Sequence, residues 1–151
     1  MRGVSGAGKS TWVKGLEETS DENVLVCSAD DYWLDKNGEY KFVPSQLGEA
    51  HKECFRKFTQ LIHYANTDSV IVVDNTNTQL HEIAPYLKFA ELYYAEVSIV
   101  RIKCDAVVAH DRNVHGVPAN TVSAQANKME KLPKYWPKET VVFTSGIGET
   151  D

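Results

Sequence analysis

Apolar residues fall into short unbroken runs that are separated by longer segments with helical spacing. The runs at 24–27, 70–73, 97–102 and 141–143 are bounded by polar residues, which is typical of strands buried on both faces. Between the runs, apolar residues recur three and four positions apart, which predicts helices over 9–19, 45–65, 83–94 and 122–129. Strands that alternate with helices predict an α/β fold with a mostly parallel sheet covered on both faces.

The chain length and the breaks in the pattern predict one domain over residues 1–151. Residues 35–44 are polar enough to form a loop. Asp105 can cap a short helix that ends near Gly116, and Pro118 prevents its continuation.

Hydropathy and cysteine usage indicate a cytoplasmic protein with no membrane partner. No apolar run approaches the ~20 residues that a membrane-spanning helix needs. The three cysteines, Cys27, Cys54 and Cys104, are far apart and give neither a zinc-ligand spacing nor a disulfide framework.

Residues 3–10 read Gly-Val-Ser-Gly-Ala-Gly-Lys-Ser and match the phosphate-binding spacing G-x-x-x-x-G-K-[S/T] directly before a predicted helix. Glycines at these positions let backbone N–H groups turn inward around phosphate oxygens, and the helix points its positive end at them. Lys9 is expected to reach the β and γ phosphates, and the Ser10 hydroxyl is expected to bind Mg²⁺. The motif predicts a P-loop NTPase fold, a three-layer α/β/α sandwich, that binds a nucleoside triphosphate. The predicted phosphate-binding residues are Ser5, Gly6, Ala7, Gly8, Lys9, Ser10 and Thr11.

The strand that should precede this loop is very short, because only Met1 and Arg2 come before Gly3. We therefore expect the first strand of the sheet to be truncated.

An acidic turn, Ser-Ala-Asp-Asp-Tyr-Trp at 28–33, follows the run at 24–27. Ligands of open α/β sheets bind at the carboxyl ends of the strands. A carboxylate at that edge can accept the proton of an attacking hydroxyl, a role open to Asp30 or Asp31, and Asp31 is also a candidate substrate contact. The alternative is that either aspartate only caps a turn.

Asp74 follows the apolar run at 70–73, in the position of a carboxylate that orients magnesium. Asn75 and Asn77 come next and offer amide groups at the same edge, as substrate contacts or as residues that shape the site. Asparagines after a strand are also common turn formers, so the alternative is a purely structural role.

Four segments in order resemble the polynucleotide-kinase-like P-loop kinases, the family of the phage polynucleotide 5′-kinase domain. They are Lys-Ser-Thr-Trp at 9–12, Asp-Asp-Tyr at 30–32, Val-Ile-Val-Val-Asp-Asn-Thr-Asn at 70–77 and Arg-Asn-Val-His-Gly-Val-Pro at 112–118. The resemblance implies that ATP is the donor and that Asp30 is the general base for a 5′-hydroxyl. It also implies that the segment at about 105–118 is a small helical lid and that Arg112 is the lid arginine. The alternative for Arg112 is a surface salt bridge to Asp111 or a neighbour. Where the family has a phosphate-contacting arginine, this chain has Trp33, on which a base or sugar could stack.

The motifs together predict an ATP- and Mg²⁺-dependent kinase in which Lys9, Asp30 and Arg112 are catalytic. Its acceptor is expected to be a polynucleotide 5′-hydroxyl, with a nucleoside or other small-molecule hydroxyl as the alternative. The net charge of −5 argues against a strong hold on long nucleic acid, so only a 5′ end would bind. A hypothesis of another class is an ATP-binding module or degenerate kinase that acts through a partner.

Overall fold

The computed structural model describes residues 1–144 and contains two pairs of parallel strands. β1 (Asn23–Cys27) pairs with β2 (Ser69–Val73), and β3 (Ile99–Lys103) pairs with β4 (Glu139–Phe143). All four predicted strands are confirmed, with shifts of up to two residues at their ends. Burial differs among the strands: Ile99 and Ile102 of β3 are buried, whereas the residues of β4 are half-buried or exposed.

Residues Met1 to Gly3 connect the two strand pairs. The Arg2 amide donates to the Val100 carbonyl, and the Ile102 amide donates to the Arg2 carbonyl, both at 2.8 Å. On the other side, the Gly3 amide donates to the Thr76 carbonyl at 3.0 Å. The short strand expected before the glycine-rich loop is therefore a single parallel bridge between Arg2 and Arg101, located between β2 and β3.

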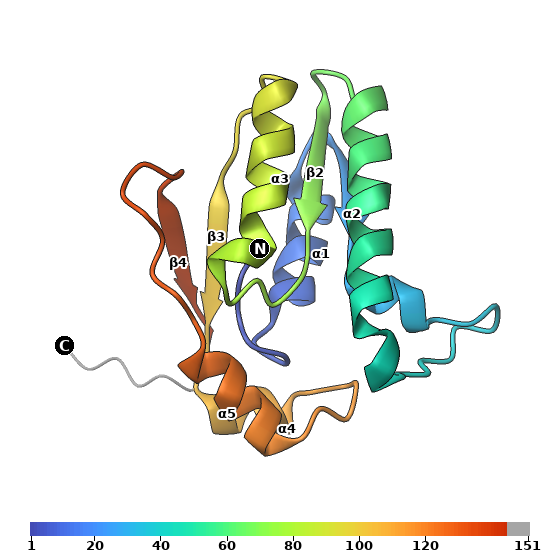
Figure 1. The fold of residues 1–151 in the computed structure, drawn as a ribbon, viewed down its shortest axis with the longest axis vertical. Helices are drawn as coiled ribbons and strands as arrows, with labels where there is room; N and C mark the ends of the chain where they lie inside the picture. The colour runs from blue at the N-terminus through green and yellow to red at the C-terminus, as the bar shows by residue number, and fades with distance from the viewer. Residues whose placement is uncertain (145–151) are drawn as a thin grey trace.

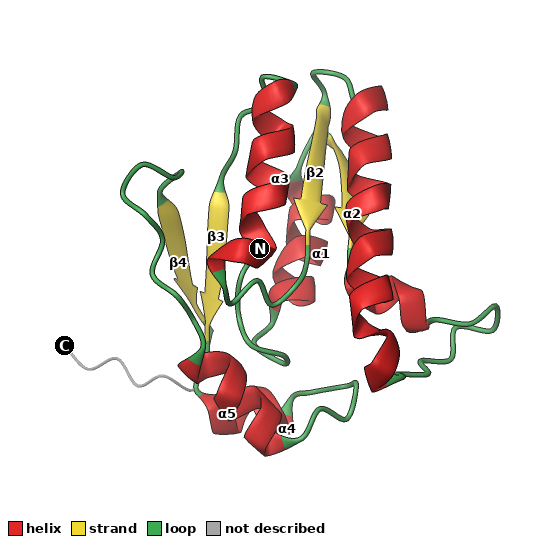
Figure 2. Ribbon diagram, in the orientation of Figure 1, coloured by secondary structure: helices red, strands yellow, loops and turns green. Residues whose placement is uncertain are grey.

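Helices cover both faces of the strands (Figure 2). α2 and α3 lie together on one side and α1 on the other, as the three-layer prediction requires (Figure 1). The bounds are α1 (Lys9–Thr19), α2 (Leu47–Tyr64), α3 (Leu80–Leu92), α4 (Ala106–Asp111) and α5 (Ala119–Asn127), with short 3₁₀ helices η1 (Ala29–Trp33) and η2 (Pro44–Gln46).

The helices predicted over 83–94 and 122–129 lie at Leu80–Leu92 and Ala119–Asn127, and two other predictions of helix ends also differ. Ser45 lies in η2 and does not open the long helix, because Pro44 starts a separate 3₁₀ turn. The helix capped by Asp105 ends at Asp111, well before Gly116. The Asp105 carboxylate accepts from the Val107 amide at 2.9 Å, as predicted for its cap.

The core has two parts. One is centred on α2, whose buried residues Ala50, Cys54, Phe58 and Ile62 recur every four positions and face β1 and η1. The other packs the glycine-rich loop against β3, α4 and α5; its buried residues are Val4, Ala7, Ile102, Ala109 and Val122. The second part fixes the loop and the lid relative to each other.

Arg2, directly before the glycine-rich loop, is only 1% exposed and makes several hydrogen bonds. Its guanidinium donates to the Glu139 carboxylate at 2.6 Å and to three carbonyl oxygens, of Asn77 at 2.8 Å, Thr78 at 3.1 Å and Glu130 at 2.8 Å. One side chain therefore joins the loop to β4 and to the segment after β2.

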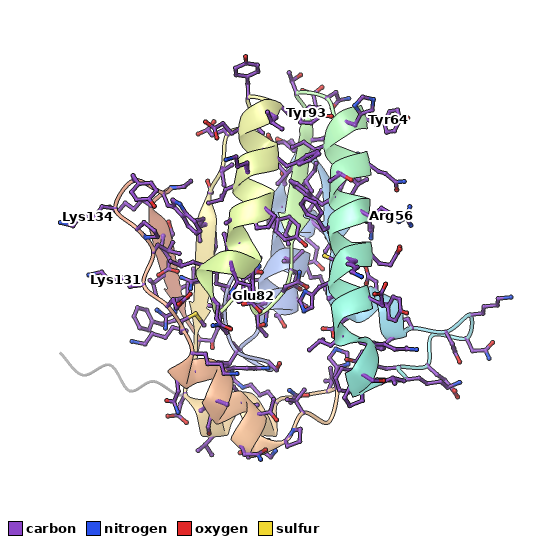
Figure 3. The ribbon with its side chains drawn as sticks, viewed as in Figure 1. Arg56, Tyr64, Glu82, Tyr93, Lys131 and Lys134 are labelled. Carbon is purple, nitrogen blue, oxygen red and sulfur yellow. The ribbon has the colours of Figure 1, made fainter. Side chains whose placement is uncertain are left out.

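The carboxyl ends of β2, β3 and β4 all point toward the side where α4 and α5 lie (Figure 1). Tyr64 and Tyr93, at the ends of α2 and α3, lie at the opposite end of the molecule (Figure 3). The predicted site residues that follow these strands therefore lie at the end of the molecule where α4 and α5 lie. Within residues 1–144, no helix is both long enough and apolar enough to cross a membrane.

Candidate active site

At Gly6 the glycine-rich loop packs too closely on α4 to accept a side chain. Gly6 has φ +80°, and a Cβ placed there would lie 1.8 Å from the Ala109 carbonyl oxygen of α4. Gly8 has φ +101° and precedes α1 with no side chain capping the helix. The first amides of α1 are therefore left to bind an anion, as the motif predicts.

Two side chains from distant segments hold the backbone of this loop. The Gln125 side chain of α5 accepts from the Ser5 amide at 2.9 Å, and the Thr144 hydroxyl donates to the Ala7 carbonyl at 3.0 Å. Gln125 must release the Ser5 amide before that amide can bind a phosphate oxygen.

Lys9 folds back over the loop, where its ammonium donates to the Val4 carbonyl at 3.0 Å. Burial lowers the pKa of Lys9, and the negative charges of Asp74 and Asp30 act in the opposite direction and raise it. Both acids that the sequence singles out are therefore close enough to influence this amine electrostatically.

Ser10 and Asp74 form a pair that fits a magnesium ion. The Ser10 hydroxyl donates to Asp74 Oδ2 at 2.8 Å, and Asp74 is only 7% exposed. Its other oxygen, Oδ1, is buried and has no hydrogen-bond partner among residues 1–144. An unpartnered buried carboxylate oxygen beside a hydroxyl is a donor set that Mg²⁺ prefers. No three His, Cys, Asp or Glu side chains of the described chain gather as a metal site, so phosphate or water oxygens would have to complete the coordination.

Asp30 lies on η1, which follows β1. The Ser28 hydroxyl accepts from the Asp30 amide at 3.2 Å, and Asn75 Oδ1 accepts from the Ala29 amide at 2.8 Å. The Tyr40 hydroxyl donates to Asp30 Oδ1 at 3.0 Å. Asp30 Oδ2 lies 3.9 Å from His115 Nε2, which is too far for a hydrogen bond.

One cavity of about 330 Å³ brings these groups together. It is lined by Ser10, Val13, Glu17, Val26, Ser28, Asp30, Asp31, Leu34, Tyr40, Asp74 and His115. Four of these residues are acids and none is lysine or arginine. Asp31 is partly neutralised from outside the cavity by Lys57, whose ammonium lies 3.2 Å from Asp31 Oδ2.

The structure corrects three predicted substrate contacts. Trp33 is only 4% exposed and packs edge to face against Tyr32 and Phe42, so the prediction that a base or sugar stacks on Trp33 is wrong. The 3₁₀ turn of η1 directs Trp33 into the core while Asp30 stays at the surface.

Asn75 and Asn77 are also buried, at 6% exposure each, and their side chains are used within the protein. Asn75 holds the Ala29 amide, and the Asn77 amide group donates to the Met1 carbonyl at 2.8 Å. These contacts agree with the expectation that both residues shape the site. Asn75 positions η1, and Asn77 positions the start of the glycine-rich loop.

Arg112 follows α4 at the helix end, where its amide donates to the Val108 carbonyl at 3.1 Å. It is an exposed residue and does not line the cavity described above. Its role as the lid arginine stays a prediction.

Seven lining residues were not among the predicted site residues: Val13, Glu17, Val26, Ser28, Leu34, Tyr40 and His115. Of these, Glu17, Tyr40 and His115 carry titratable side chains. Glu17 could have been found, because Ser10, Val13 and Glu17 are three and four positions apart on α1 and so share a face. Tyr40 and His115 carry no such signal, since only the folded chain brings these two segments together.

Comparison with known proteins gives a family match over most of the chain. The family described as "AAA domain" matches residues 1–131. Human NEDD4-binding protein 2 is 32% identical over 145 residues, which are 87% of this chain but 8% of that protein. The 2′,3′-cyclic-nucleotide 3′-phosphodiesterase of Rattus norvegicus is 28% identical over 104 residues, which are 68% of this chain and 23% of that protein. The chain thus spans less than a quarter of the length of these two relatives.

Two solved structures share the fold. A gluconokinase from Sinorhizobium meliloti 1021 superposes with a TM-score of 0.61 at 14% identity, over 95% of this chain and 80% of the other. The Mycobacterium tuberculosis APS kinase, solved with AMPPNP and APS, gives 0.60 at 17% identity, over 95% and 86%. The chain therefore has the three-layer fold of P-loop kinases, as its sequence predicted.

Proposed function

The chain belongs to the AAA domain family, and from this premise we propose that it is an ATP-dependent kinase that transfers the γ-phosphate to a hydroxyl group. One observation carries the proposal: Ser10, Asp74 and Asp30 line a single cavity next to Lys9. A phosphate-binding loop, a carboxylate of the kind that orients magnesium and a candidate base, all around one cavity, support a site for phosphoryl transfer.

The proposed roles follow from these positions. The loop amides and Lys9 bind the phosphates of ATP. Ser10 and Asp74 would hold Mg²⁺, which supplies positive charge against the phosphate oxygens when it is bound. Asp30 Oδ2 accepts the proton of the acceptor hydroxyl as its oxygen bonds to the γ-phosphorus and the bond from that phosphorus to the β–γ bridging oxygen breaks. ADP leaves, and Arg112 is proposed to neutralise charge during the transfer.

Two classes of acceptor hydroxyl are proposed. The order of the four motifs supports a polynucleotide 5′-hydroxyl, which is the first proposal. The cavity supports a small-molecule hydroxyl as the second, because no lysine or arginine among residues 1–144 lines it to meet a phosphodiester. The buried position of Trp33 also removes the one predicted stacking surface for a base.

An acceptor screen with γ-labelled ATP and Mg²⁺ tests the proposal. The acceptors are 5′-hydroxyl oligonucleotides, nucleosides and small alcohols or sugars, and Lys9→Ala is the negative control. We expect label on at least one hydroxyl class with the native chain and none with the variant. Label on small molecules alone selects the second acceptor class. Tight ATP binding with no transfer to any acceptor would replace the kinase with the ATP-binding module.

A further inference from the structure

Tyr40 and His115 meet directly over the candidate base. Their rings stack with centroids 4.1 Å apart and planes 29° from parallel. Each also approaches Asp30: the Tyr40 hydroxyl donates to Oδ1 at 3.0 Å, and His115 Nε2 lies 3.9 Å from Oδ2. Two residues that are 75 positions apart therefore converge on one carboxylate; we call them the Tyr40–His115 pair.

A small hairpin places Tyr40. Leu34 and Tyr40 form an antiparallel bridge, and the Lys41 amide donates to the Trp33 carbonyl at 2.8 Å. Trp33 is itself buried in the core, so the hairpin is anchored at its base although most of residues 35–43 are exposed. Tyr40 is half-buried at the point where the hairpin returns to η1.

The lid places His115. Asn113 Oδ1 accepts from the His115 amide at 2.8 Å and from the Val117 amide at 3.3 Å, which folds the segment between α4 and α5 into a turn. The stack on Tyr40 is therefore a contact between the lid segment and the hairpin, and both residues line the cavity.

The hydrogen bond from the Tyr40 hydroxyl makes the two carboxylate oxygens of Asp30 different. Burial raises the pKa of Tyr40, and the charge of Asp30 and the hydrogen bond to it raise that pKa further, so the phenol keeps its proton. Oδ1 is thus occupied by a donor. Oδ2 receives no hydrogen bond from the described residues and lies on the side of His115.

We propose that Tyr40 is a positioning residue that orients Asp30 toward the acceptor, and that His115 closes the acceptor pocket and contacts the acceptor. This inference rests on the kinase function proposed above and adds the acceptor-side wall of the same site. The pocket receives an acceptor whose hydroxyl reaches Oδ2 beneath His115, and the stack couples closure of the lid to alignment of the base.

Tyr40→Phe tests the positioning role, because it keeps the ring for stacking and removes only the hydroxyl. We expect kcat for transfer to fall about 10- to 100-fold, the effect of one lost hydrogen bond to a charged group, while KM for ATP stays within about twofold. Tyr32→Phe is the matched control, since Tyr32 is exposed on the same turn and does not line the cavity; its kcat should match the native chain.

His115→Ala tests the acceptor contact, with His110→Ala on α4 as the matched control. Loss of the stack and of the pocket wall should raise the acceptor KM about 3- to 10-fold and leave KM for ATP unchanged. Equal kinetics for Tyr40→Phe and the native chain, or equal acceptor KM for His115→Ala and His110→Ala, would overturn the inference and leave the kinase function standing. A native chain that phosphorylates no acceptor would overturn both.

Discussion

Replacing Arg2 by alanine should lower the free energy of unfolding by roughly 3–5 kcal/mol, the usual cost of removing one partner from a buried charged network. The structure supports this magnitude. Arg2 is 1% exposed and serves one carboxylate and three carbonyl oxygens. Each of these acceptors loses a donor, and an unpaired buried acceptor costs about 1–3 kcal/mol before relaxation and water entry reduce the sum.

Arg101 provides the matched control because it contacts the same carboxylate from a more exposed position. Its guanidinium lies 3.9 Å from Glu139 Oε2, and its side chain is 29% exposed. An exposed ion pair is worth about 0–1 kcal/mol, so Arg101→Ala should cost far less than Arg2→Ala. Arg2→Lys should fall between them, because an ammonium keeps the charge but cannot reproduce the planar fork.

Urea unfolding followed by tryptophan fluorescence measures all three variants, and thermal unfolding gives a second estimate. For a domain of this size the Arg2→Ala loss corresponds to a drop in Tm of about 6–20 °C. Equal losses for Arg2→Ala and Arg101→Ala would refute the reasoning, since the burial and the carbonyl contacts of Arg2 would then contribute nothing.

Two further predictions address the loop and the core. Gly6→Ala should abolish ATP binding in an equilibrium titration, because its Cβ would lie 1.8 Å from the Ala109 carbonyl oxygen. Gly15→Ala is the control, since a Cβ at Gly15 has nothing within 4 Å. This variant should raise the free energy of unfolding by about 0.5–1 kcal/mol. If both glycine variants bind ATP like the native chain, the close contact with the lid is not required. Burial raises the pKa of Cys27 from 9.0 to about 12. At pH 8, iodoacetamide should therefore label Cys27 about 1,000-fold more slowly in the native chain than in urea. Mass spectrometry of peptides measures both rates, and similar rates would contradict the burial of Cys27.

Local signals explain why the fold and the phosphate loop could be predicted from the sequence. Strands buried on both faces must be continuous apolar runs, so their positions are visible without any knowledge of the fold. The glycine-rich loop is a contiguous motif in which spacing alone sets the backbone geometry. Asp30 and Asp74 follow strands directly, and the carboxyl ends of parallel strands share one edge.

The residues that sequence reasoning misjudged depend on contacts between distant segments. Trp33 follows an acidic turn, and nothing in the sequence says whether its ring points outward or into the core; the 3₁₀ geometry of η1 decides it. The partners of Arg2 lie 75 to 137 positions away, so its burial has no local signature. Tyr40 and His115 likewise meet only after the hairpin and the lid have folded.

The central claim is that the phosphate loop and Asp30 form one kinase site, in which the loop binds ATP and Asp30 accepts the proton of the acceptor hydroxyl. Asp30→Asn tests it most directly, because the amide keeps the size of the side chain but cannot accept the acceptor's proton. ATP affinity and γ-phosphate transfer are measured on the same preparation, with the best acceptor from the screen. The account predicts that transfer falls at least ~100-fold while the Kd for ATP changes less than about threefold. Native transfer by the variant, or an equal loss of binding and transfer, would contradict it.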